Sequence, residues 1–254
     1  MAAYGDFAWF YDEFNGEADY QALFDYVHGE LEANGVAGGL LADLGCGTGD
    51  LTLMLSQAGY DVIGIDRSPE MLSVFREKAD ELGLSGKVLL LCQDILSMEL
   101  YGTIRAAVST FDTFNHIGPI QQFEKAVRQA AFFMEKGGVF LFDLNTPYKH
   151  ENVLGNNCYT IEAPDARCDW QNRYDPAGWV DMQLTITDLP SGEVVHESLR
   201  EYSYPLEEVK AALERYGFDL VKVSDGEDFG PVRPDSQRWI FTAVKRYTQE
   251  EKHD

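Results

Sequence analysis

The sequence predicts an α/β fold in which seven strands form one sheet with helices on both faces, and a small antiparallel sheet is inserted into it. Apolar strand-like runs alternate with helical patterns from Leu40 to Leu144, which is typical of a parallel sheet covered on both faces. Four strand-like segments separated by turns follow, and then a last helix and two more strands. The 254 residues suffice for one domain that carries such an insert.

The first half of the chain is predicted element by element from the spacing of its apolar residues. An aromatic start precedes a helix over residues 18–32, whose apolar residues share one face. We expect strands over 40–44, 61–66, 88–92, 106–110 and 139–144, and helices over 51–58, 69–82 and 120–134. Pro69 at a helix start and Gly83 beyond its end fit the preferences of helix termini. Gly137-Gly138 is expected to turn the chain into the fifth strand.

The second half begins with the insert. Its strands are expected over 159–162, 168–174, 179–188 and 193–204, with turns at 175–178 and 189–192. In the third of these strands apolar and polar residues alternate, as in a sheet with one wet face. A helix from Pro205 through Tyr216 and strands over 218–223 and 239–245 complete the main fold. We therefore expect a main domain of residues 1–144 and 205–247, whose first 35 residues form a lid and a helix, and an insert of residues 145–204 that covers the substrate.

Composition excludes several classes of protein. The net charge of −23 would repel a polyanion such as tRNA, and no cluster of Lys and Arg opposes it, although acidity also simply keeps a protein soluble. No apolar run is long enough to span a bilayer, and the N-terminus does not resemble a signal peptide. The four cysteines form no CxxC pair and no metal-ligand spacing with histidine. We expect a cytoplasmic protein with free thiols, no metal site and no membrane partner.

A glycine-rich loop follows the first strand of the alternating region. Dinucleotide-binding folds use GxGxxG, which would require glycine at position 50, but this residue is Asp50 and the glycines fall as GxGxG. An acid, Asp43, precedes the first glycine by two residues, and another, Asp66, ends the second strand. With this loop, the chain resembles the class I S-adenosylmethionine-dependent methyltransferases, closely over residues 40–144 and more loosely over the last helix and strands. The resemblance implies a Rossmann-like sheet and disfavours a nicotinamide-dependent oxidoreductase.

The resemblance also implies roles for single residues. Gly45 and Gly47 would let the backbone approach the methionyl part of S-adenosylmethionine, and Asp66 would accept both ribose hydroxyls. Asp94 would bind the adenine amino group, and Asp43 would lie near the ammonium and sulfonium, unless Asp94 is a solvated loop acid and Asp43 a helix cap. The full set expected to bind the cofactor, which leaves as S-adenosylhomocysteine, is Tyr11, Asp43, Gly45, Cys46, Gly47, Gly49, Asp66, Arg67, Asp94, Ile95 and Thr110.

Three further segments are similar to a bacterial subgroup of small methyltransferases that carry an inserted antiparallel sheet. They are the aromatic segment over residues 4–12, the segment 111–115 after the fourth strand, and the segment 142–149 after the fifth. The resemblance makes Tyr4, Phe7 and Tyr11 lid residues over the cofactor, although an aromatic stripe is also typical of ordinary core packing. Residues 145–148, Asn-Thr-Pro-Tyr, follow the wrong strand for the Asn/Asp-Pro-Pro-Tyr motif, so we infer no nucleobase or glutamine substrate.

The acceptor is expected to be a small molecule bound beneath the insert. Methyl transfer from a sulfonium needs positioning and water exclusion more than a base. If the acceptor must lose a proton, His116 and Tyr11 are the candidates. Substrate contacts are expected from Trp170, Arg173, Tyr174, Arg200 and Tyr202, unless the two arginines pair with acids on neighbouring strands. An RNA or protein methyltransferase and a non-catalytic S-adenosylmethionine-binding protein remain alternatives, and the sequence leaves monomer or homodimer open.

Overall fold

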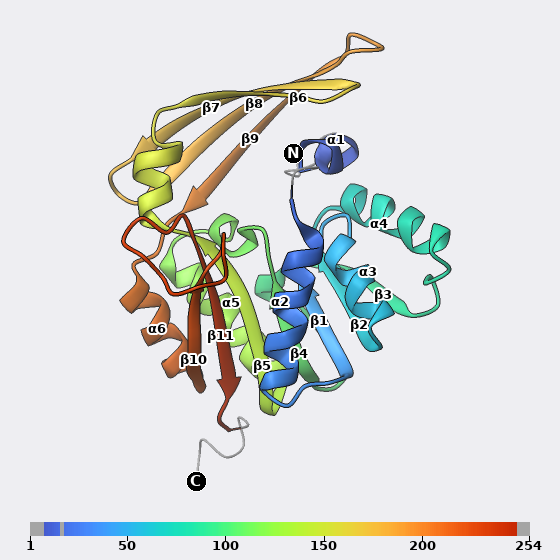
Figure 1. Ribbon diagram of the computed structural model, residues 1–254, viewed down its shortest axis with the longest axis vertical. Coiled ribbons are helices and arrows are strands. Elements are labelled where there is room, and N and C mark those ends of the chain that lie inside the picture. The colour runs from blue at the N-terminus through green and yellow to red at the C-terminus, as the bar shows by residue number, and fades with distance from the viewer. Residues whose placement is uncertain (1–7, 16–17, 248–254) are drawn as a thin grey trace.

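A computed structural model describes residues 8–15 and 18–247 (Figure 1). Its main sheet has the strand order β10-β11-β5-β4-β1-β2-β3, and β1 to β5 pair in parallel, whereas β11 is antiparallel to both neighbours. The strands are β1 (Gly39–Leu44), β2 (Tyr60–Asp66), β3 (Val88–Cys92), β4 (Ile104–Ser109), β5 (Met134–Asn145), β10 (Phe218–Asp225) and β11 (Arg238–Lys245). The predicted fold class is confirmed.

Helices cover both faces of this sheet. They are α1 (Ala8–Phe14), α2 (Tyr20–Ala33), α3 (Asp50–Gln57), α4 (Pro69–Glu81), α5 (Ile120–Phe133) and α6 (Leu206–Arg215), with the short helices η1 (Ile95–Ser97), η2 (Thr113–His116) and η3 (Lys149–Leu154). Leu41 of β1 packs against α2 and α3, whereas Ala42 and Leu44 pack in the cluster that contains α5 and α6. Both faces of the strand are therefore buried, which explains why its apolar residues do not alternate with polar ones. Within the described residues, no helix is both long and apolar enough to cross a membrane.

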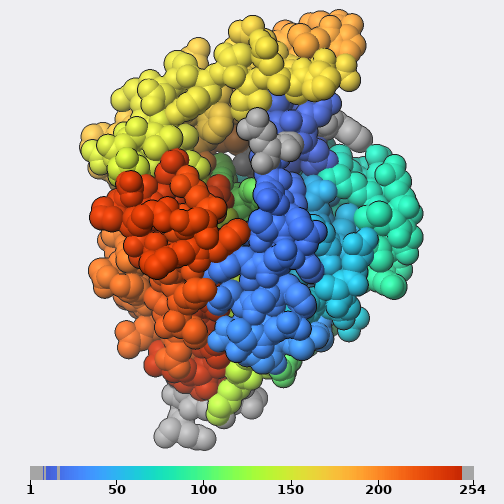
Figure 2. Space-filling model, viewed as in Figure 1, coloured from blue at the N-terminus to red at the C-terminus, as the bar shows by residue number. Residues whose placement is uncertain are grey.

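The insert forms a separate four-stranded antiparallel sheet in the order β6-β7-β8-β9. Its strands are β6 (Cys158–Glu162), β7 (Ala166–Asp175), β8 (Trp179–Asp188) and β9 (Val194–Tyr202). The inner face is apolar, because the buried side chains of β8 are Val180, Met182, Leu184 and Ile186, as the alternation predicts. Figure 1 shows this sheet above the main body, with α1 beneath it, and Figure 2 shows that it covers one end of the molecule.

The structure differs from the sequence-based expectations in three places. The expected turn at Gly137-Gly138 lies within β5, where the pairing with β4 jumps from Met134 to Val139. A Cβ on Gly138 would lie 2.5 Å from Met134 Cγ, so this bulge requires a residue without one. Helix α1 and the π-helix η3 were not predicted, because each is too short to show a periodic pattern. All four cysteines are free, as expected.

Candidate active site

The glycine loop after β1 turns sharply because Gly45, Gly47 and Gly49 have φ angles of 79°, 52° and 89°, which favour glycine. A Cβ on Gly45 would lie 2.3 Å from Thr113 Cγ2, and one on Gly49 would lie 2.4 Å from the Phe75 ring. These two glycines therefore let the loop pack against the protein itself. A Cβ on Gly47 would meet nothing within 4 Å, so its backbone is the part of the loop that is open to a ligand.

Asp66, the last residue of β2, fixes the loop from the side. Its carboxylate accepts hydrogen bonds from the backbone N–H of Gly47 at 3.0 Å and of Ser68 at 2.8 Å. Burial raises the pKa of Asp66, although these two hydrogen bonds act in the opposite direction. The carboxylate is thus held at a fixed position beside Gly47, with lone pairs left for a ligand.

A cavity of about 800 Å³, called here the loop cavity, opens at this point. Residues after the ends of β1, β2, β3 and β4 line it, which is where ligands bind in open α/β sheets. Its lining is Tyr11, Gly45, Gly47, Asp66, Arg67, Met71, Gln93, Asp94, Ile95, Leu96, Phe111, Thr113, His116 and Ile117. Asp94 caps η1 by accepting the backbone N–H of Leu96 at 2.8 Å, so one of its oxygens is already engaged.

A smaller cavity of about 360 Å³, the inner cavity, adjoins the loop cavity and shares Gly45, Gly47 and Thr113 with it. Asp43 lies at its base, 3% exposed, and accepts a hydrogen bond from Thr52 Oγ1 at 2.5 Å. Burial raises the pKa of Asp43 to about 7, against the lowering effect of that hydrogen bond. In the described part of the chain Asp43 has no cationic partner, so a cation bound here would relieve the cost of its burial.

The structure brings the predicted cofactor residues together. All eleven line the loop cavity or the inner cavity, and Cys46, Gly49 and Thr110 line the inner one. Tyr11, from α1, lines both. The other two predicted lid residues, Tyr4 and Phe7, lie outside the described residues.

A third cavity, of about 920 Å³, lies between the insert and the main body and is called here the insert cavity. It shares Tyr11, Phe111 and His116 with the loop cavity, so these three side chains separate two adjacent ligand spaces. Its apolar lining is Phe14, Leu154, Ile161, Cys168, Trp170, Met182, Leu184 and Leu199, and its polar lining is Asn15, Asp112, Asn145, Lys149, Glu201 and Arg238. The cavity is thus apolar against the insert and charged against the main sheet.

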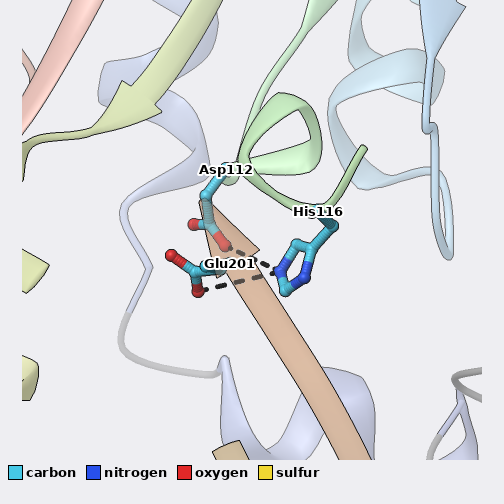
Figure 3. A group of neighbouring side chains, drawn as sticks. All are labelled: Asp112, His116 and Glu201. Carbon is cyan, nitrogen blue, oxygen red and sulfur yellow. Dashed lines mark ion pairs between the residues drawn. The ribbon is translucent and has the colours of Figure 1, made fainter. Parts of the chain in front are cut away.

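Figure 3 shows the charged group nearest the shared wall, Asp112, His116 and Glu201. Nε2 of His116 lies 3.4 Å from Oδ2 of Asp112 and 3.7 Å from Oε1 of Glu201, and Nδ1 lies 3.2 Å from the Arg200 carbonyl oxygen. Burial lowers the pKa of His116, but the two carboxylates outweigh burial and raise it above its ordinary value. His116 is therefore held at the wall between the cavities with both ring nitrogens facing acceptors, which favours its imidazolium form.

The backbone beside His116 is strained. Phe111 and Asp112 both have positive φ, 56° and 55°, which costs a non-glycine residue on the order of 1 kcal/mol. Asp143 holds them there, because its carboxylate accepts both backbone N–H groups at 2.9 and 2.7 Å. Arg238 of β11 joins Asp143 and Asp112 through hydrogen bonds of 2.6 and 2.7 Å. Strain of this kind concentrates at functional sites.

The donor atoms of Asp112, His116 and Glu201 all lie within 4.8 Å of one another, close enough to hold a metal ion. Both carboxylates already have partners, however. Asp112 pairs with Arg238, and Glu201 accepts hydrogen bonds at 2.9 Å from His150 and at 2.8 Å from the Asn145 amide. We therefore describe the group as a charged network in the wall of the insert cavity rather than as a metal site.

Of the predicted substrate residues, the structure places only Trp170 in the insert cavity. The prediction is corrected for Arg173, Tyr174, Arg200 and Tyr202, which do not line it. Arg173 and Arg200 lie on the outer face of the sheet and pair with Asp181 at 2.8 and 2.5 Å. Tyr202 is also on the outer face, opposite Trp179. Tyr174, next to the last residue of β7, pairs with Val180 and packs on the inner apolar cluster without lining the cavity.

Several site residues were missed by the sequence analysis. Asp143 and Glu201 are buried acids within strands, and Arg238 begins another strand. A charged residue inside an apolar strand such as residues 139–144 indicates a buried charge with a partner elsewhere in the fold, because burying an unpaired charge is costly. Lys149 is the last residue of the segment 142–149, and no pattern in the sequence indicates a role for it.

Comparisons with known proteins agree with this geometry. A family model described as a methyltransferase domain matches residues 41–138. YqeM of Bacillus subtilis (strain 168) is 27% identical to this chain over 251 residues, which cover 96% of this chain and 98% of YqeM. Its name gives methyltransferase activity as an assignment, not as a demonstrated activity. The crystal structure of an S-adenosylmethionine-dependent methyltransferase from Clostridium acetobutylicum ATCC 824 matches with a TM-score of 0.86 and 26% identity, over 95% of this chain and 98% of that one. The chain is an S-adenosylmethionine-dependent methyltransferase.

The two cavities at the glycine loop of this methyltransferase fit S-adenosylmethionine. Gly47 leaves backbone open to a ligand, Asp66 presents a fixed carboxylate, and the buried Asp43 lacks a cation that the ligand could supply. A more distant structure, the sugar N-methyltransferase KedS8 from Streptoalloteichus sp ATCC 53650, shares the fold, with a TM-score of 0.73 and 19% identity over 97% of each chain.

Proposed function

We propose that this methyltransferase methylates a small molecule bound in the insert cavity, and that residues 145–204 act as the cover of that cavity. The observation that carries the proposal is the shared wall of Tyr11, Phe111 and His116 between the loop cavity and the insert cavity. An acceptor atom at this wall lies next to the space that fits the cofactor, as in-line transfer requires. Trp170 and the apolar insert residues enclose the acceptor from the other side.

S-Adenosylmethionine supplies an electrophilic methyl group, and the residues of the chain position the acceptor and exclude water. We assign Asp43 and Asp66 to the cofactor and place the acceptor atom beside His116 and Tyr11. If the acceptor carries a proton that must leave, His116 can receive it only in its neutral form, which Asp112 and Glu201 disfavour by raising its pKa against burial. KedS8, named as a sugar N-methyltransferase, supports a small-molecule acceptor for this fold.

Two alternatives are less well supported. An RNA methyltransferase is disfavoured by the net charge of −23. A non-catalytic S-adenosylmethionine-binding protein would be favoured if Phe114 or Trp170 filled the acceptor space. Phe114 instead packs in the core against Phe123, Phe140 and Phe142, and Trp170 lines a cavity of about 920 Å³.

Isothermal titration with S-adenosylmethionine tests the cofactor site. We expect Asp66→Ala to weaken binding by about tenfold or more, because charged hydrogen bonds contribute about 1.5–3 kcal/mol. Asp61→Ala, at the exposed start of the same strand, is the matched control and should bind normally. Undiminished binding by Asp66→Ala, with a normal melting temperature, would count against the assigned site. A co-structure with S-adenosylhomocysteine would then show the size and polarity of the acceptor space.

A further inference from the structure

The charged end of the insert cavity contains two cations in different situations. Arg238 is neutralised, because its guanidinium forms ion pairs with Asp112 at 2.7 Å and Asp143 at 2.6 Å. Lys149, at the start of η3, donates one hydrogen bond at 2.9 Å, to the side-chain oxygen of Asn145. Within residues 8–15 and 18–247 it forms no ion pair, so its ammonium meets a neutral acceptor only.

Asn145 lies between Lys149 and one of its neighbouring acids, Glu201. The amide of Asn145 accepts from Lys149 and donates to Oε2 of Glu201 at 2.8 Å, so it lies between the ammonium and the carboxylate. Oε2 of Glu201 also accepts from the buried His150 at 2.9 Å. Glu201 is therefore satisfied without Lys149, and two of the three ammonium donors remain for a ligand in the cavity.

A partly buried ammonium with so few partners is costly unless a ligand compensates it. Burial, together with the charge of Arg238, lowers the pKa of Lys149, although Asp112, Glu201 and Asp143 act in the opposite direction without forming an ion pair with it. The remaining walls of the insert cavity are apolar and include Trp170 and Leu184. The cavity thus offers one cationic anchor at the main sheet and an apolar surface opposite it.

We propose that Lys149 binds an anionic group of the methyl acceptor, a carboxylate or a phosphate, while the apolar part of the acceptor packs on the insert. This rests on the proposed function, since it takes the insert cavity as the acceptor site. It makes Lys149 a specificity-determining residue, and it selects an amphipathic anion as the substrate class.

The test is binding of matched ring compounds to the complex with S-adenosylhomocysteine, measured by ligand-observed NMR titration. Benzoate, phenyl phosphate and the neutral benzamide are compared on wild type, Lys149→Met and Lys149→Arg. Lys210→Met, which removes a surface lysine that pairs with Glu207, is the control for loss of charge. Melting temperature and S-adenosylhomocysteine affinity are measured for every variant.

We expect wild type and Lys210→Met to bind an anion about tenfold or more tightly than benzamide, as a charge-assisted hydrogen bond provides. Lys149→Met should lose that preference while keeping its affinity for benzamide and S-adenosylhomocysteine, and Lys149→Arg should retain part of it. The tighter of benzoate and phenyl phosphate identifies the anion. Equal binding of benzamide and both anions overturns this inference alone, as does an unchanged preference in Lys149→Met. Absence of binding by all three compounds overturns it together with the proposed acceptor cavity.

Discussion

Asp43 combines burial with a missing counter-charge. It lies in the buried part of β1, one residue before the end of the strand, and within the described residues its side chain hydrogen-bonds the neutral hydroxyl of Thr52. Burial raises its pKa to about 7, so the folded protein without ligand favours the protonated acid. Its contribution to stability is present below the ordinary carboxyl pKa and is lost as the pH rises to about 7. A cationic ligand reverses this preference, because it stabilises the carboxylate.

S-Adenosylmethionine affinity should therefore depend on pH through Asp43. Because the bound cation lowers the pKa of Asp43, affinity should rise by about tenfold between about pH 5.5 and about pH 7.5 and level off above it. Isothermal titration across this range measures the effect, and Asp43→Asn should bind more weakly with little pH dependence. Asp61→Asn, at an exposed position, should follow wild type. An equally steep profile in Asp43→Asn would assign the proton to another group.

The residues that line the loop cavity and the inner cavity could be predicted from sequence because most of them lie in short segments directly after strands. The charged lining of the insert cavity could not, because it comes from η2 and its preceding residue, η3, β9 and β11, which meet only in the folded chain. Glu201 and His116, for example, are brought together by the packing of β9 on η2.

At the scale of elements, strand register decides which insert residues face the insert cavity. The sequence shows the alternation in β8, where Ile186 is buried and Gln183 exposed. Pairing transfers this alternation to β7 and β9, since Asp181 opposes both Arg173 and Arg200. Both arginines consequently lie on the wet face. To predict that the two arginines lie outside the cavity, one must know the register of all three strands, and sequence spacing alone does not fix that register.

The two faces of β8 should respond differently to the same substitution. Ile186→Asp places a carboxylate in the apolar cluster between the insert and α1 and should lower stability by about 3 kcal/mol or more. Gln183→Asp, on the same strand but facing solvent, should change it by less than about 0.5 kcal/mol. Thermal unfolding followed by circular dichroism compares the two. Similar melting temperatures would mean that the inner face of the insert is not packed as described.

Over the whole molecule, α1 connects the insert with the main body. Ala8 packs in the cluster that contains the inner face of the insert and Met71 of α4. Asp12, one turn further along α1, accepts a hydrogen bond from Thr48 of the glycine loop at 2.6 Å and pairs with Lys78 of α4 at 2.6 Å. Tyr11 of the same helix lines all three cavities. Contacts with the glycine loop, the insert and α4 thus hold this short helix in place.

Lys78 is the residue whose loss should release α1. It pairs with Asp12 at 2.6 Å and Asp50 at 2.8 Å, so Lys78→Met leaves two like charges facing each other beside Thr48. We expect faster hydrogen exchange in residues 8–14 and a few-fold weaker affinity for S-adenosylmethionine, a modest effect because all three side chains are partly exposed. Lys222→Met, which removes a surface lysine paired with Glu30, should change neither. If α1 exchanges at the wild-type rate in Lys78→Met, the apolar contacts of α1 hold it without the ion pair, and cofactor affinity should then be independent of Lys78.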